Sequence, residues 1–150
     1  IHARPELLSL FGRMRFAMGQ NQLGLRSFGE FLNAGDYEPH LQHIRNVYRG
    51  KRDAINDALT RQVSDYLDWV LPDGGFYIWA RLKPGLSLES LWRTAVEEGI
   101  AVNPSTGFSP VGESESCIRI AYSWTPVEQF EEAVSRLRIA CERVARGDVA

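Results

Sequence analysis

The sequence predicts an α/β chain in which three helices, one of them long, precede a small sheet with helices packed on one face. Up to residue 62, apolar residues recur at the helical spacing of three and four positions. From Leu67 onward the period changes to two in separate stretches, which is typical of strands with one buried face. A hydrophobic fraction of 44% and a charged fraction of 24% are those of a globular chain.

The first part of the chain is predicted to be helical. Helices are expected over residues 5–18 and 23–33, with the polar joint Gln20–Gln22 between them. Asp36 can cap a third and longer helix that extends to Gln62. The apolar stripe of this long helix contains Leu41, Ile44, Tyr48, Ile55 and Leu59.

A pair of strands follows, joined by a turn. Leu67–Leu71 and Phe76–Leu82 both alternate in character from one residue to the next. Pro72–Gly75 between them is a strong turn signal because it combines Pro, Asp and two glycines. Together these stretches predict a β-hairpin.

The last part of the chain is predicted to alternate helices with strands. Ser87 can cap a helix that Gly99 ends, and a short strand over Ile100–Asn103 comes next. A loop rich in Gly, Ser and Pro leads to a further strand, Cys117–Ser123. The final helix is expected to begin with a capping box at Thr125.

Composition excludes several classes of function. The 17 basic and 19 acidic residues give a net charge of −2, so the chain offers no positive field for nucleic acid or an anionic membrane. Its longest apolar run, Phe76–Ala80, is too short to span a membrane. Two cysteines, Cys117 and Cys141, are too few for a disulfide framework or a zinc site, which predicts a reduced, cytoplasmic protein. Because the chain begins with Ile1 and not Met, we expect further sequence upstream.

Arg119 is the most informative candidate for a binding role. It lies on a predicted strand, on the face opposite Ile118 and Ile120, just after a long loop. An arginine there presents a two-pronged donor suited to a carboxylate. An edge arginine in solvent and a structural ion pair are the alternatives. The loop Asn103–Phe108 is a second candidate, either for function or as a plain connection.

Two histidines on the long helix raise the question of a metal site. His40 and His43 stand three residues apart, a spacing that would let both side chains reach one ion. No third ligand is obvious, which favours a capping or solvent-facing role. The sequence therefore predicts no metal site.

Four stretches, in one order, resemble the C-terminal third of class I and II aminotransferases, the fold type I enzymes that use pyridoxal phosphate (PLP). The resemblance is strongest to the branch that contains 2-aminoadipate aminotransferases and the aminotransferase-like domains of MocR regulators. The family's P-x-G-G-[MF]-[FY]-[LI]-W pattern corresponds to Pro72–Trp79, and its L-R-L-x-[FY]-[SA] pattern to Ile118–Ser123. The other two stretches are Tyr37–Arg52 on the long helix, and Gly99–Val102 followed by Pro104 and Phe108.

This resemblance implies roles for individual residues. The arginine that matches Arg119 pairs with the α-carboxylate of the amino-acid substrate, and the aromatic residue that matches Phe108 lies close to the substrate pocket. Asn21 falls in a segment that reaches the dimer interface in many members, which implies a place near the partner subunit's cofactor. Ser105 stands where the family usually has glycine, so its side chain is expected to narrow or reshape the pocket mouth.

The family's Schiff-base lysine has no counterpart here. Lys51 and Lys83 are the two lysines of the chain, and neither matches it. We therefore expect no catalytic residue in this chain, which alone should be inactive and should not hold PLP covalently. The resemblance also implies a helical remnant of the large PLP-binding domain at 1–35, a long connecting helix at 36–62 and a C-terminal small domain of the PLP-dependent transferase fold at 63–150.

The function implied by the resemblance is that of the C-terminal segment of a PLP-dependent aminotransferase. It would supply α-carboxylate recognition and the mobile small domain for amino-group transfer between an amino acid and a 2-oxo acid. Its expected partners are the rest of its own chain and a second copy in a homodimer, with no nucleic acid and no membrane bound through this segment. The alternatives are the effector-sensing domain of a MocR/GntR-type transcription regulator and a stand-alone α/β binding module, which upstream sequence would distinguish.

Overall fold

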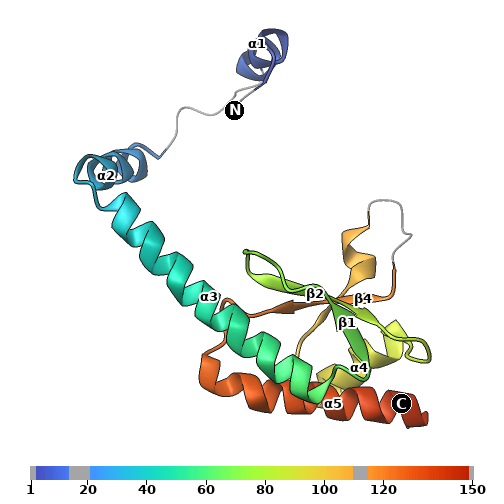
Figure 1. The fold of residues 1–150 in the computed structure, drawn as a ribbon. Helices are drawn as coiled ribbons and strands as arrows, with labels where there is room; N and C mark the ends of the chain where they lie inside the picture. The colour runs from blue at the N-terminus through green and yellow to red at the C-terminus, as the bar shows by residue number, and fades with distance from the viewer. Residues whose placement is uncertain (1–2, 14–20, 110–114, 149–150) are drawn as a thin grey trace. The chain divides into compact units, whose positions relative to one another are not determined.

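A computed structural model describes residues 3–13, 21–109 and 115–148 of the chain. The chain forms two compact units, Ile1–His43 and Ile44–Ala150. The first unit is helical, and the second contains the sheet (Figure 1).

The predicted helices of the first unit are present in the part of the chain that is described. They are α1 (Pro5–Arg13), α2 (Gln22–Asn33) and the start of α3 (Tyr37–Gln62), which is the long helix. Residues 14–18, the predicted end of the first helix, lie outside the described residues, as does Gln20 of the polar joint.

The first unit has little core of its own. Neither α1 nor α2 contains a buried residue, and Phe11 and Phe28 are 46% and 53% exposed. Phe31 is half-buried, and its ring contacts those of Tyr37 and His40 at centroid distances of 6.4 and 5.8 Å. The apolar stripes of α1 and α2 therefore gain little from burial within the unit.

The second unit is built on a four-stranded antiparallel sheet with the order β1-β2-β4-β3 (Figure 1). The predicted hairpin is confirmed, since β1 pairs with β2 and Leu67 lies opposite Leu82. The sheet consists of β1 (Leu67–Trp69), β2 (Tyr77–Leu82), β3 (Asn103–Pro104) and β4 (Cys117–Ala121).

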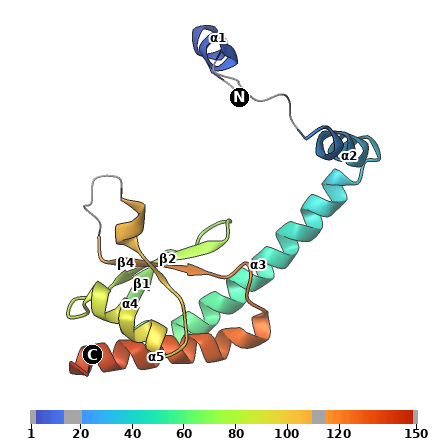
Figure 2. The ribbon, with the colours of Figure 1, turned by 180° about the vertical axis from the view of Figure 1, so that it is seen from behind.

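Helices cover one face of this sheet, as the sequence predicts. Figures 1 and 2 show α4 (Leu88–Glu97) and α5 (Phe130–Arg146) on the same side of the sheet, together with the C-terminal part of α3. Along β2 the buried Ile78 and Ala80 alternate with exposed residues, so one face of the strand meets the helices. Fully burying a side chain the size of Ile78 stabilises the fold by about 1.5–3 kcal/mol.

The core between sheet and helices draws on every layer of the second unit. The helix α5 contributes a continuous stripe at helical spacing, and Ser87 caps α4 by accepting a hydrogen bond from the amide of Ser90. The largest fully buried side chains include Leu59, Leu67, Ile78, Leu91, Ile118 and Tyr122.

In the described part of the chain, none of the helices has both the length and the apolar character needed to cross a membrane.

Several predicted boundaries are wrong. The strand predicted at Cys117–Ser123 ends at Ala121, and the one predicted at Phe76–Leu82 begins at Tyr77. The first strand ends at Trp69 because the chain turns outward there, leaving Val70 87% exposed. The third strand is Asn103–Pro104 and not Ile100–Asn103, since this is where β4 offers hydrogen-bonding partners. The predicted capping box at Thr125 is replaced by a 3-10 turn, Val127–Gln129, so the last helix begins later.

Candidate functional site

The sheet face that the helices leave open carries a row of large polar and aromatic side chains. On β2, strand alternation places Tyr77, Trp79 and Arg81 on this face, and all three are exposed. On β4 the same alternation places Arg119 there, between the buried Ile118 and Ile120. We call this surface the open face of the sheet.

Arg119 lies in the interior of the sheet and not at an edge. Its strand, β4, lies between β2 and β3. In the register of the sheet it lies opposite Trp79 on one side and Asn103 on the other. The first alternative for this residue, an edge arginine in solvent, is therefore wrong.

Two aromatic rings hold the Arg119 guanidinium. Its central carbon Cζ lies 4.3 Å from the ring centroid of Tyr77 and 4.5 Å from that of Phe108. Both distances are within the range of a cation–π interaction. Rings attract the cation without using its N–H groups, so the donors of Arg119 stay available for an acceptor.

The guanidinium lacks a protein acceptor among the described residues. Its Nε atom is buried and has no hydrogen-bond partner there, and no ion pair within that part of the chain involves Arg119. Two acids close to this face are taken by other cations: Glu115 pairs with Arg81 at 2.6 Å, and Asp68 with Lys83 at 3.4 Å. A buried donor without a partner costs about 1–3 kcal/mol.

Phe108 reaches this arginine from a short 3-10 helix, η1 (Ser105–Phe108), that follows β3. Its ring also contacts Trp79 edge-on, with the centroids 5.8 Å apart.

The expectation that Ser105 narrows or reshapes the pocket mouth is wrong. Its side chain is buried and not at the pocket mouth, and its hydroxyl donates to the Glu115 carbonyl and accepts from the amide of Cys117.

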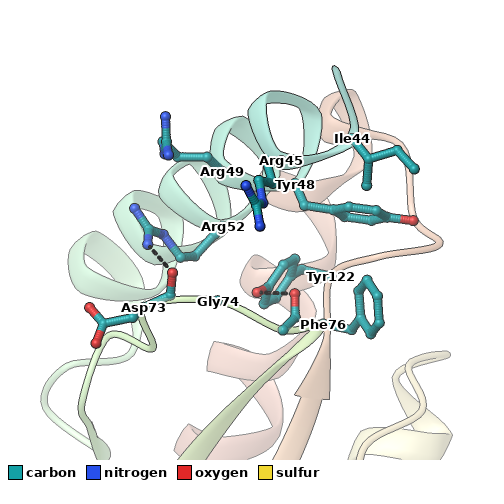
Figure 3. Close-up of a pocket in the computed structure, with 10 residues that line it drawn as sticks. Ile44, Arg45, Tyr48, Arg49, Arg52, Asp73, Gly74, Phe76 and Tyr122 are labelled. Atoms are coloured by element: carbon teal, nitrogen blue, oxygen red, sulfur yellow. Dashed lines mark hydrogen bonds between the residues drawn. The ribbon is translucent and has the colours of Figure 1, made fainter. Parts of the chain in front are cut away.

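A separate cavity of about 500 Å³ lies between α3 and the turn that joins β1 to β2 (Figure 3). Arg52 fixes the turn by donating from Nη1 to the carbonyls of Pro72 and Asp73, at 3.1 and 3.3 Å. Tyr122 fixes its other end by donating its hydroxyl to the Gly75 carbonyl at 2.7 Å. The cavity is lined by Ile44, Arg45, Tyr48, Arg49, Arg52, Asp73, Gly74, Gly75, Phe76 and Tyr122.

Both lysines are engaged with backbone carbonyls. The Nζ atom of Lys51 donates to Ser123 and Thr125 at 2.7 and 3.0 Å, which holds the loop after β4. The Nζ atom of Lys83 donates to Ser64 at 2.6 Å. Both amines are thus engaged in hydrogen bonds, and Lys83 also pairs with Asp68.

The remaining candidates lie in the first unit. The Asn21 side chain caps α2 by accepting a hydrogen bond from the Gly24 amide at 3.0 Å. The His40 ring packs against Phe31. In the described residues, no cluster of three or more His, Cys, Asp or Glu side chains includes His40 or His43.

Burial perturbs two titratable groups of the second unit. It raises the pKa of the Cys141 thiol to about 12, and the nearby Glu142 carboxylate adds to the rise. Burial also raises the pKa of Tyr122, and the charge of Arg52 opposes this increase. Both groups therefore stay protonated near neutral pH.

Sequence reasoning missed Tyr77 and Trp79 as neighbours of Arg119. The signal was present, because both residues alternate with the buried Ile78 and so fall on the face opposite the core. Antiparallel pairing of β2 with β4 then brings this row beside Arg119. The order of the strands, which alternation alone does not give, was the missing step.

Comparisons with known proteins agree on one family. The family model described as "Aminotransferase class I and II" matches residues 14–137. The chain is 37% identical over 108 residues to the 2-aminoadipate transaminase of Thermus thermophilus, which covers 72% of this chain. It is also 24% identical over 133 residues, 89% of this chain, to an uncharacterized HTH-type transcriptional regulator, YdfD, of Bacillus subtilis. The chain spans 27% of the length of each of these two curated relatives.

A solved structure extends the agreement to the fold. The alpha-aminoadipate aminotransferase of Thermus thermophilus, complexed with N-(5'-phosphopyridoxyl)-L-leucine, superposes with a TM-score of 0.83 at 32% sequence identity. The match covers 95% of this chain and 37% of that one.

Proposed function

The chain belongs to the class I and II aminotransferase family, and we propose that it is the C-terminal part of a PLP-dependent aminotransferase that moves an amino group between an amino acid and a 2-oxo acid. In this proposal the chain contributes the group that binds the α-carboxylate of the substrate. The other parts of the reaction fall to other residues of the complete protein.

The environment of Arg119 is the observation that carries the proposal. The guanidinium is held by Tyr77 and Phe108, and its Nε is buried without a partner among the described residues. Glu115 and Asp68, the two described acids named above, pair with other cations. A guanidinium fork matches a carboxylate in two parallel hydrogen bonds. Held in this way, Arg119 would orient an amino or 2-oxo acid with little further loss of side-chain freedom.

Arg119 acts by binding and not by proton transfer. A guanidinium stays protonated in proteins, so it presents a constant positive charge to the carboxylate. Phe108 and Tyr77 keep water from the faces of the guanidinium that they cover, which strengthens its attraction for an anion. Phe108 thus lies beside the substrate in this proposal.

The residues of this chain do not fit covalent attachment of PLP. Attachment needs a free lysine amine, and Lys51 and Lys83 both donate to backbone carbonyls. When bound elsewhere in the enzyme, PLP supplies the electron sink for amino-group transfer. Asn21 stays in the proposal as a residue near the partner subunit's cofactor, although its side-chain oxygen also caps α2.

The proposal keeps the division of the chain into a helical part at 1–35, a connecting helix at 36–62 and a small domain at 63–150. The long helix α3, Tyr37–Gln62, supports this division, whereas the two compact units meet inside that helix, between His43 and Ile44. A homodimer and a cytoplasmic location belong to the same proposal, and the family assignment supports the homodimer. This chain alone is expected to lack transaminase activity.

A regulator is the second candidate function. It is supported by the similarity to the HTH-type regulator YdfD, which covers 89% of this chain. In that case Arg119 would bind the carboxylate of an effector, and DNA would be bound by another domain. Sequence-specific DNA binding by the complete protein, without transaminase activity, would favour this candidate.

The test is a pair of leucine substitutions on the open face of the sheet, made in the complete protein. Arg119→Leu should raise KM for the amino acid by about 10- to 100-fold, as expected for a lost charge-assisted hydrogen-bond pair. Arg81→Leu is the matched control because Arg81 lies on the same face but is exposed and paired with Glu115. Equal kinetics for the two variants would refute the role of Arg119.

A further inference from the structure

The cavity between α3 and the Pro72–Gly75 turn has the features of an anion site (Figure 3). Three arginines of α3 line it, at positions 45, 49 and 52, so they recur along one side of the helix at intervals of four and three. We infer that this cavity binds a small dicarboxylate. The inference goes beyond the proposed function, because none of the residues that carry it belongs to the Arg119 site.

The positive charge of the cavity is only partly neutralised. Arg52 is held by Asp53, at 2.7 Å, and by the carbonyls of the turn. Arg45 and Arg49 have no ion pair or hydrogen bond with any side chain in the described part of the chain. Like charges four residues apart repel on a helix, and an anion between or beside them relieves this repulsion.

No acid of the lining offsets these two cations. The lining contains one carboxylate, that of Asp73, and Figure 3 shows it turned away from the rings of Tyr48 and Tyr122. Figure 3 also shows Arg45 reaching from α3 toward Tyr122, while Arg49 points outward at the rim. One cation within the cavity and one at its rim suit a ligand with two negative groups.

The apolar wall of the cavity determines what kind of chain can join the two negative groups of the ligand. The Tyr48 and Phe76 rings meet edge-on with their centroids 5.0 Å apart, and Tyr122 closes the floor with its hydroxyl already bound to Gly75. Phe76 is 46% exposed, which leaves part of its ring free to contact a ligand. A short hydrocarbon chain between two carboxylates matches this wall, whereas inorganic phosphate has no apolar part to place against it.

The binding surface is held in place before a ligand arrives. Arg52 and Tyr122 fix the two ends of the turn through its backbone carbonyls. Gly75 has φ of +95°, a backbone conformation that residues other than glycine rarely adopt, so the turn has a defined shape. A ligand therefore meets a formed cavity and does not have to order it.

The test uses glutarate as the probe and the complete protein carrying Arg119→Leu, so that the proposed substrate site does not contribute. Glutarate should raise the midpoint of thermal unfolding more than sodium chloride at equal ionic strength, because a ligand that binds the native state stabilises it. The neutral isostere glutaramide should give no rise. Adding Arg45→Gln to the same protein should weaken the apparent affinity for glutarate by about tenfold or more.

The matched control is Arg93→Gln, which removes an exposed arginine of α4 that pairs with Glu89. This control should bind glutarate as the parent does. The inference is overturned if glutarate acts no better than sodium chloride, if Arg45→Gln together with Arg49→Gln leaves the affinity unchanged, or if inorganic phosphate is equally effective. Since every protein in this test lacks Arg119, its outcome is independent of the proposed transaminase activity.

Discussion

Phe108 is predicted to assist carboxylate binding by restricting Arg119, and the substitution Phe108→Ala isolates this effect. The ring lies 4.5 Å from the guanidinium and contacts Trp79 on its other edge. Removing it frees one side of a long side chain whose full ordering costs up to about 2 kcal/mol. Tyr77 still holds the guanidinium at 4.3 Å, so we expect about half of that cost to appear in binding.

A loss of about 1 kcal/mol corresponds to a rise in KM of about fivefold for the amino acid. The effect on kcat should be smaller, because Phe108 positions a binding group. The free energy of unfolding should fall by about 1 kcal/mol. The ring is 47% exposed, so truncation removes about half of the free energy gained by burying a whole phenylalanine side chain. Steady-state kinetics give the first two quantities, and urea unfolding gives the third.

Phe108→Tyr is the matched control because it keeps the ring over the guanidinium. It should retain the parent KM. If Phe108→Ala folds normally and binds the amino acid as tightly as the parent, the ring does not position Arg119. If Phe108→Tyr is as impaired as Phe108→Ala, the effect comes from general disruption of η1, and the reasoning is refuted.

Two further predictions concern stability. Because the native state keeps the Cys141 thiol protonated up to a pKa of about 12, against 9.0 without burial, the free energy of unfolding should fall by up to about 4 kcal/mol as pH rises between these values. Cys141→Ala should lack this fall, and identical pH slopes of urea unfolding for the two proteins would contradict the assignment. Tyr122→Phe removes the hydrogen bond to the Gly75 carbonyl and should lower the free energy of unfolding by about 1–2 kcal/mol in the same assay, so an unchanged midpoint would show that the bond contributes nothing.

The sequence predicted the elements of the second unit better than their edges. Alternation in Phe76–Leu82 located β2 because Ile78 and Ala80 are buried against helices, and burial is what the pattern records. The ends of the strands depend on where a neighbouring strand stops, which no local pattern contains. For this reason β3 was misplaced toward Ile100, although it pairs at Asn103.

The candidate site shows the same division between local and distant information. The type of residue and its strand face made Arg119 a candidate for binding a carboxylate, which stays a prediction, and the resemblance placed Phe108 close to the substrate pocket. Tyr77 was not predicted, since its contact with Arg119 depends on the register between β2 and β4. Ser105 was misread because sequence gives no direction for a side chain in a loop, and its hydroxyl in fact anchors the start of β4.

The most direct test of the account compares two substrates in two proteins. An amino acid and its carboxamide differ in the charge that Arg119 is proposed to bind. The complete protein should prefer the amino acid by about tenfold or more in kcat/KM, and Arg119→Leu should abolish this preference. A preference that persists unchanged in Arg119→Leu would contradict the assignment of carboxylate binding to Arg119.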